Sequence, residues 1–283
     1  MTPADLTITP RDRRFGRARK ARRHWLNGDP IATAFFNALS ITFPRGEAFF
    51  IDSVRAFRDG APERLGREIA AFIRQEVIHS REHLAFNRQV TDQGYDVALL
   101  DADVTMVLDL ATSRPPIVRL AATMALEHFT AILAHELLRD PRYLDGADPD
   151  LAGLWRWHAI EEIEHKGVAY DTWRHATRDW RPLKRWWMQS SMMVIVTRHF
   201  LHHRARGMME LLRQDGITGV RAWGGLLRYA LVRPGLLRRV VIPWLGYFRP
   251  GFHPWQVDDR ALIALADSPY ADAREKGALP ATA

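Results

Sequence analysis

Two short segments of this chain repeat one arrangement of titratable side chains, and both have helical periodicity. QEVIHSREH contains Glu76 and His79, and WHAIEEIEH contains Glu162 and His165. Because residues three apart share one face of an α-helix, each pair directs a carboxylate and an imidazole to the same side. Such a pair can bind one side of a metal ion, so the two pairs constrain how their helices pack.

The hydrophobic pattern is helical almost throughout, and few stretches alternate with period two. Clusters of Gly, Pro and Asp, such as RDGAPE and DWRPL, mark the turns. A helix of about 25 residues is nearly 40 Å long, which suits a helical bundle. We therefore expect an all-α protein with long helices at roughly 31–57, 62–92, 115–139 and 150–178, and a shorter helix near 96–111.

Two of the long helices each place a single glutamate in apolar surroundings. Glu47 lies in FPRGEAFFI, and Glu127 lies in MALEHFTAIL. An acid on an apolar helix face is costly unless it is paired or binds a metal. The order along the chain is Glu, Glu-x-x-His, Glu, Glu-x-x-His, one set per helix, which is the signature of di-iron and di-manganese carboxylate bundles. The long separation of Glu76 from Glu127 fits the crossover of a ferritin-like four-helix bundle.

The helical wheel of the last cluster adds His158 to the metal-binding face, four residues before Glu162. Glu161 is either the ligand in place of Glu162, although its own partner three residues on is a glutamate, or a residue that supports the ligands. His83 is either a ligand or hydrogen-bond donor to one, or a core histidine. We expect Glu76 and Glu127 to bridge two metal ions. The predicted ligands are Glu47, Glu76, His79, Glu127, His158, Glu162 and His165, and the four glutamates among them are also the predicted catalytic residues.

Four other polar residues near these motifs are expected to be structural. His128 points about 100° away from Glu127 on the helical wheel, and His135 follows on the same face. Tyr170 and Asp171 could steady a ligating histidine, but a structural role is favoured.

The chain contains no cysteine, which excludes disulfides, iron–sulfur clusters and thiolate zinc sites. Carboxylate and imidazole ligands without sulfur suit iron or manganese. We expect two iron ions, with a mixed Mn/Fe pair, manganese or zinc as alternatives.

The segments FPRGEAFF, QEVIHSREHLAFN, ALEHFTA and WHAIEEIEHKGVAYD resemble the bacterial family named predicted metal-dependent hydrolases. The resemblance covers roughly residues 30–178 and, more loosely, the tail. The ligand pattern is also similar to that of di-iron arylamine N-oxygenases, in which an additional histidine stands four residues before the last Glu-x-x-His. His158 has this position here, and this second resemblance covers the ligands alone.

Helix-borne glutamates favour oxygen chemistry, because hydrolytic sites usually draw more aspartates from loops above a sheet. We therefore expect a dinuclear non-haem iron oxygenase or oxidase that uses O₂ and an electron donor. The apolar surroundings of the motifs predict a hydrophobic substrate, such as an acyl chain or an aromatic amine. A dinuclear metal-dependent hydrolase, as the family name implies, is the alternative.

The predicted organisation is a basic segment at 1–29, the metal-binding bundle at 30–178 and a helical extension at 179–283. The formal net charge is +7, and much of the surplus lies at the two ends. No nucleic-acid-binding motif is present, so no nucleic-acid partner is expected. The longest uncharged run of KRWWMQSSMMVIVTRHF has twelve residues, fewer than the about 20 that span a bilayer. The extension is expected to pack on the bundle, closing an apolar tunnel, or to lie on a membrane surface.

No signal peptide is visible, so we expect a cytoplasmic protein, with peripheral attachment to the inner membrane as an alternative. A homodimer is left open.

Overall fold

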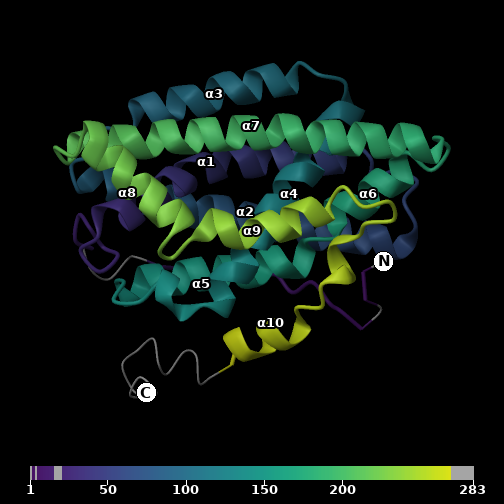
Figure 1. Cartoon of the computed structure of the whole chain (residues 1–283). Helices are drawn as coiled ribbons and strands as arrows, with labels where there is room; N and C mark the ends of the chain where they lie inside the picture. Colours follow the sequence, from purple (N-terminus) through teal and green to yellow (C-terminus); the bar gives the residue numbers. More distant parts are fainter. Residues whose placement is uncertain (1, 4, 16–20, 269–283) are drawn as a thin grey trace.

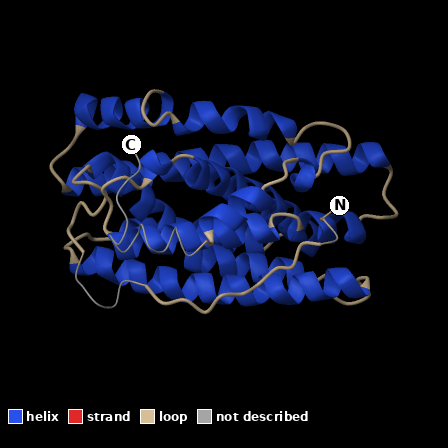
Figure 2. Ribbon diagram, turned by 90° about the horizontal axis from the view of Figure 1, so that it is seen from below, coloured by secondary structure: helices blue, strands red, loops and turns tan. Residues whose placement is uncertain are grey.

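The computed structural model describes residues 2–3, 5–15 and 21–268, and this part of the chain is almost entirely helical (Figure 2). It contains no β-strand within the described ranges, although Leu26 and Ala147 form an isolated antiparallel bridge. The predicted all-α class is confirmed. The end of the predicted extension, from residue 269, and parts of the basic segment at 1–29 lie outside the described residues.

The helices that carry the predicted ligands pack as two antiparallel hairpins (Figure 1). α1 (Pro30–Arg55) packs against α2 (Glu63–Asp92), and α4 (Pro116–Arg139) packs against α5 (Pro149–His165). Contacts of α1 with α4 and of α2 with α5 join the hairpins. α3 (Ala98–Thr112) forms part of the long connection between them. This arrangement fits the predicted four-helix bundle.

The prediction of one helix over 150–178 is wrong, because α5 ends at His165 and α6 (Val168–Ala176) begins three residues later. Gly167 lies in the break. A Cβ atom at this position would be 2.6 Å from the Thr2 hydroxyl and 3.0 Å from the Trp255 ring. The chain near both ends therefore packs directly against the backbone here, which requires glycine.

Capping residues set the starts of the helices that carry the site. The Asp29 side chain accepts hydrogen bonds from the first backbone N–H groups of α1, and Asp148 does the same for α5. Pro30 and Pro149 follow at the first helical position, where no backbone N–H is needed.

A proline in the interior of α1 links this helix to α2. Pro44 has no N–H, so the Ser40 carbonyl loses its usual helical donor. The Asn87 side chain on α2 donates to this carbonyl from Nδ2 at 3.2 Å, and the Ser40 hydroxyl donates to Asn87 Oδ1 at 2.7 Å. The freed carbonyl is therefore satisfied from α2, about two turns before Glu47.

As far as residue 268, the C-terminal extension covers the bundle with four further helices (Figure 1). α7 (Pro182–Gln214) packs on α1 and α4, and α8 (Gly219–Leu231) packs on α1. α9 (Leu236–Gly246) lies on α4, and α10 (Arg260–Ala266) contacts α4 and α5. Among the described residues, the short 3₁₀ turn η1 (Pro141–Tyr143) lies between α4 and α5, and η2 (Pro254–Gln256) lies between α9 and α10.

Within the described residues, α4 is the one helix long and apolar enough, by length and composition, to cross a membrane. Of its apolar window, 61% is buried inside the protein. It contacts α1, α5, α6, α7 and α9, so its position in the core accounts for its composition.

Candidate metal centre

All seven predicted ligands converge between α1, α2, α4 and α5, and all are buried. These residues form three overlapping groups. Within each group, every residue offers one donor atom, and these donor atoms all lie within 4.8 Å of one another. Their convergence is a property of the fold, while their role as ligands stays a prediction. The groups are Glu47, Glu76 and His79; His79, His158 and Glu162; and Glu76, Glu127 and His165.

Eight buried nitrogen and oxygen atoms of these side chains have no hydrogen-bond partner among the described residues. Unpaired buried polar atoms are rare in native proteins, because each costs free energy. Two divalent cations would satisfy this set, so the donor set fits a dinuclear metal centre. The atoms are Glu47 Oε1, both carboxylate oxygens of Glu76 and of Glu127, Glu162 Oε2, His79 Nδ1 and His165 Nε2.

Two carboxylates lie between the imidazoles of His79 and His165. His79 Nδ1 is 3.7 Å from Glu76 Oε2 and 3.6 Å from Glu162 Oε1. His165 Nε2 is 3.3 Å from Glu76 Oε1 and 3.6 Å from Glu162 Oε1. Glu127 Oε2 is 3.4 Å from His165 alone. Glu76 and Glu162 therefore lie between the two imidazoles, and the bridging of two ions by Glu76 and Glu127 stays a prediction.

The electrostatics of the centre change when a cation binds. Burial raises the pKa of Glu47, Glu76 and Glu127 well above the usual 4.5, and neighbouring carboxylates raise it further. Burial also acts to raise the pKa of Glu162, but the imidazoles beside it outweigh this effect and hold it well below the usual value. Three carboxyl groups therefore hold protons without a cation, and metal binding releases them.

Glu161 lies behind His79, outside the centre. Its Oε2 is 3.0 Å from His79 Nε2, and its Oε1 accepts hydrogen bonds from Trp157 Nε1 at 3.1 Å and from the Arg11 backbone N–H at 2.8 Å. Donation from His79 Nε2 leaves His79 Nδ1 free to face the centre. A carboxylate in this position orients a ligating imidazole and fixes its tautomer.

A second hydrogen-bonded chain supports His165, and the sequence did not predict it. Gln75 Oε1 is 3.0 Å from His165 Nδ1, and Gln75 Nε2 donates to Glu164 at 3.0 Å. The Arg11 guanidinium donates to both oxygens of Glu164, at 3.0 and 2.7 Å. Arg11 thus supports both imidazoles from the basic segment at 1–29. It is more than 150 residues from its partner, and no local sequence pattern connects them.

His83 supports His158. Its Nε2 is 2.6 Å from His158 Nδ1, its Nδ1 is 2.8 Å from the Ser40 hydroxyl, and His158 Nε2 is 2.9 Å from Glu162. Burial lowers the pKa of His83 well below 6.5 and that of His158 to about 4, so both rings are neutral at pH 7. Donation from His158 Nδ1 to His83 then leaves His158 Nε2 directed at the centre. His83 also lies close enough to Glu47 and His158 to share a cation with them.

Other polar residues near the motifs do not contact the centre. His128 Nε2 lies 3.3 Å from the Pro243 carbonyl, and His135 Nδ1 lies 2.8 Å from Asp259. These contacts attach α4 to the C-terminal extension, in agreement with the expected structural roles. Tyr170 donates to the Phe252 carbonyl, and Asp171 accepts from Thr2 and lies 3.1 Å from His253 Nε2.

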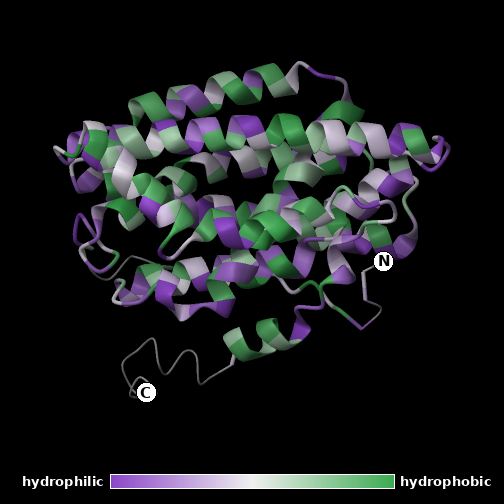
Figure 3. Cartoon of the chain, in the orientation of Figure 1, coloured by the Kyte–Doolittle hydropathy of each residue, from purple (hydrophilic) through white to green (hydrophobic). Residues whose placement is uncertain are grey.

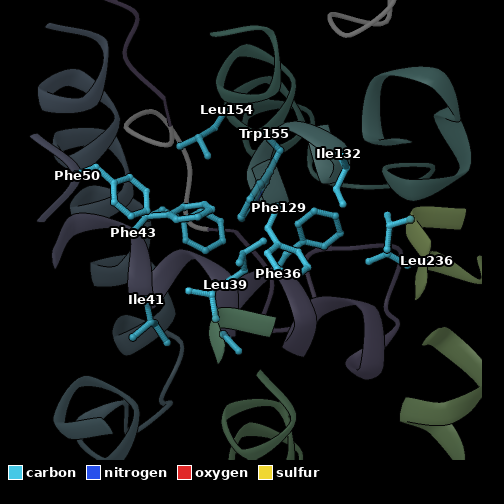
Figure 4. Close-up of a cluster of buried hydrophobic side chains, with 14 of the residues drawn as sticks. Phe36, Leu39, Ile41, Phe43, Phe50, Phe129, Ile132, Leu154, Trp155 and Leu236 are labelled. Atoms are coloured by element: carbon cyan, nitrogen blue, oxygen red, sulfur yellow. The ribbon is translucent and has the colours of Figure 1, made fainter. Parts of the chain in front are cut away.

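A narrow cavity of about 50 Å³ reaches the centre at His158 and Glu162. Its walls come from α1, α4, α5 and the start of α9. Most of the lining is apolar, and several of its side chains belong to the hydrophobic cluster of Figure 4. The cavity therefore gives an apolar group access to two candidate ligands. Lining residues labelled in Figure 4 are Phe36, Leu39, Phe43, Trp155 and Leu236.

The fold and this centre define an all-helical protein with a buried carboxylate–imidazole site of the kind that holds metal ions. A family model described as "Predicted metal-dependent hydrolase" matches residues 9–258, and the chain belongs to this family. The match begins before the predicted residue 30 and includes Arg11, and it continues through helices α7 to α9 of the tail, which the resemblance was expected to cover more loosely. No curated protein and no solved structure matches the chain.

Proposed function

We propose that this protein is an enzyme whose dinuclear metal centre acts on a hydrophobic substrate. The eight unpartnered donor atoms buried between the four helices carry the proposal, because two cations would satisfy them. The family description adds metal dependence. The narrow apolar cavity beside His158 and Glu162 supports a hydrophobic substrate.

The chain's own residues would bind the two ions and keep their ligands in place. Glu47, His79 and His158 would hold one ion and Glu127 and His165 the other, with Glu76 and Glu162 between them. When bound, such ions supply Lewis acidity for hydrolysis or, if they are iron, redox chemistry with O₂. Around them, Glu161, Gln75 and His83 direct the imidazole nitrogens to the centre.

Hydrolysis of an ester-like bond is the reaction that the family description supports most directly. Apolar walls would place the bond beside the ions and exclude other nucleophiles. A dinuclear iron oxygenase or oxidase is the second candidate. The donor set supports it, because four glutamates and three histidines on bundle helices suit iron and manganese.

Metal content and anaerobic assays separate the two reactions. Purified protein would be loaded with iron, manganese or zinc and incubated with p-nitrophenyl acyl esters, with and without O₂. A hydrolase turns over under strict anaerobiosis with zinc or manganese. An oxygenase consumes O₂ in step with product from an acyl chain or aromatic amine and requires a reductant. Protein that holds no metal, or that shows neither activity when loaded, would overturn the proposed function.

A further inference from the structure

A second hollow, of about 520 Å³, opens beside the narrow cavity. Its walls come from the chain before α1, η1, α8 and the connection from α8 to α9. Tyr143 lines both spaces, and Leu236 of the narrow cavity follows Pro234 of the second hollow by two residues. We call this second space the polar hollow, and it is the wider neighbour of the apolar cavity.

Two arginines of the polar hollow have no partner for their charge. Arg228 and Arg233 are exposed, and neither guanidinium has a hydrogen bond or ion pair among the described residues. Arg142 also lines the hollow, but it binds Asp140 through two nitrogens. Residues 216–257 contain six arginines and neither Asp nor Glu, so the local surplus of positive charge is large.

Two buried tyrosines of the polar hollow have unpartnered hydroxyl groups. Tyr143 is 4% exposed and Tyr229 is 7% exposed, and neither hydroxyl has a hydrogen-bond partner among the described residues. Burial raises the pKa of Tyr143 to about 12 and that of Tyr229 still further. Both hydroxyls therefore keep their protons, and each has a donor that no described residue uses.

The acidic residues of the hollow leave this donor set available. Asp29 lines it, but its side chain accepts two backbone hydrogen bonds as the cap of α1. Asp145 is exposed at its edge. Two unpaired guanidinium groups and two unpartnered hydroxyls match a carboxylate or phosphate, because such an anion accepts several charge-assisted hydrogen bonds.

The size of the narrow cavity limits the kind of group that can be attached to an anion bound in the polar hollow. A volume of about 50 Å³ has room for about three to five water-sized groups. This space suits an unbranched chain better than a ring system. The chain would pass Phe36 and Trp155 before it reached His158 and Glu162.

We propose that the two spaces form one site for an unbranched amphiphile with a single anionic head. The head binds Arg228 and Arg233 in the polar hollow, and the end of the apolar chain lies in the narrow cavity and reaches the metal centre. The position of the chain end at a metal centre rests on the proposed function. Binding of the head and chain does not require turnover. The head is a carboxylate, as in a free fatty acid, or a phosphate, as in a lipid headgroup.

Direct binding measurements on the full chain test this proposal. Isothermal titration of metal-loaded protein would compare dodecanoate and dodecyl phosphate with dodecanol, which has the same chain and no charge. We expect both anions to bind at least tenfold more tightly than dodecanol. Tighter binding of dodecyl phosphate identifies a phosphate head, and tighter binding of dodecanoate identifies a carboxylate. Equal affinity of dodecanol and the two anions would overturn the proposal.

Variants on the molecular surface locate the head. R228Q/R233Q should weaken dodecanoate binding about tenfold, while the matched control R221Q, an exposed arginine of the same helix outside the hollow, should leave it unchanged. Equal affinity of R228Q/R233Q and the unsubstituted protein would place the head elsewhere.

Chain length locates the tail. Binding should tighten from octanoate to dodecanoate, and Ala134→Leu, which fills the narrow cavity, should abolish this gain. If a folded Ala134→Leu variant still binds the longer chain more tightly by the same factor, the tail does not lie in the narrow cavity. If the protein binds the anionic amphiphiles as expected but shows no turnover, only the proposed function is refuted. If it shows turnover but no preference for an anionic head, only this inference is refuted.

Discussion

At the scale of single residues, Glu127 gives the clearest test of the ligand set. Both its carboxylate oxygens are unpartnered, and burial with neighbouring acids raises its pKa. Glu127→Gln keeps the size of the side chain and removes its charge, so we expect loss of at least one metal ion per chain in elemental analysis. Glu136→Gln is the control on the same helix, because Glu136 is also buried but pairs with Arg139 and Arg239. Two ions in the Glu127→Gln protein would contradict the assignment.

A substitution at Glu161 tests whether residues behind the candidate ligands orient them. Its two oxygens accept from His79, Trp157 and Arg11, and a glutamine offers one oxygen in their place. We expect Glu161→Gln to keep both ions but to weaken metal affinity about 10- to 100-fold, measured by competition with a chelator.

The matched control for Glu161 is another buried acid that holds the N-terminal segment. Glu82 accepts from the Phe15 backbone and from Arg81, away from His79. Glu82→Gln should leave the metal affinity nearly unchanged. Equal affinities for the Glu161→Gln and Glu82→Gln proteins would show that Glu161 has no orienting role.

The candidate metal ligands could be predicted from the sequence, because helix geometry alone places Glu76 with His79 and Glu162 with His165. The same geometry separated Glu162 from Glu161, and the structure puts Glu161 behind His79. Residues such as Arg11 could not be predicted, since their contacts depend on how distant segments pack.

At the scale of elements, periodicity located the long helices, but it did not locate the break between α5 and α6. The helical pattern continues through Gly167, and the break becomes evident only where Thr2 and Trp255 pack against the backbone. The pattern also could not show that α9 would close one end of the apolar cavity with Leu236.

Gly167→Ala tests this close approach. The added Cβ would lie 2.6 Å from the Thr2 hydroxyl and 3.0 Å from the Trp255 ring, so neighbours must move. We expect a loss of about 1–3 kcal/mol in the free energy of unfolding, as for other overpacked sites. Gly66→Ala in α2 is the control, because no atom lies within 4 Å of its added Cβ. It should be neutral or stabilise by up to about 1 kcal/mol. Similar losses in both proteins, measured by denaturant titration, would contradict the packing argument.

The outer faces of α8 and α9 combine exposed apolar residues with arginines (Figure 3). Val220, Trp223 and Ile242 are at least half exposed, and residues 216–257 contain no acid. We predict that these helices bind an anionic membrane surface, with arginines at the headgroups and apolar side chains below them.

Vesicle sedimentation checks the membrane prediction. Phosphatidylglycerol vesicles should retain the protein at low salt, phosphatidylcholine vesicles should not, and added salt should release it. Trp223→Ser should weaken retention more than Trp187→Ser, which removes an exposed tryptophan from α7. Absence of any preference for anionic vesicles would count against a membrane role for these helices.

At the scale of the whole molecule, the fold encloses more acid than its own cations can neutralise. Four helices bring their glutamates together at the centre, and the basic surplus of the chain lies elsewhere, on the N-terminal segment and on α7 to α9. Arg11 stands behind Glu161 and Glu164, with Glu161 between it and His79. The stability of the folded chain must therefore depend on bound cations and, without them, on bound protons.

This dependence predicts how the stability of the metal-free protein varies with pH. The pKa values of Glu47, Glu76 and Glu127 are raised by burial. Burial lowers that of His79, but the bond to Glu161 and the charges of the nearby carboxylates together outweigh burial and raise it. A group with a raised pKa in the folded state contributes stability that is lost as pH rises through that value. The groups with lowered pKa, Glu162 among them, already contribute fully above pH 6.5.

Among these groups of the centre, only the first set changes above pH 6.5, so their contribution should make the Tm of the metal-free protein fall as pH rises toward 9. Metal binding strengthens over the same range, because the ligands must lose their protons to bind. The difference in Tm between loaded and metal-free protein should therefore widen with pH in thermal unfolding measured by circular dichroism. In Glu127→Gln protein, which lacks one titrating carboxyl, the fall in the metal-free Tm should be shallower. A difference that stayed constant or narrowed would mean that these carboxyl groups are not protonated in the metal-free centre.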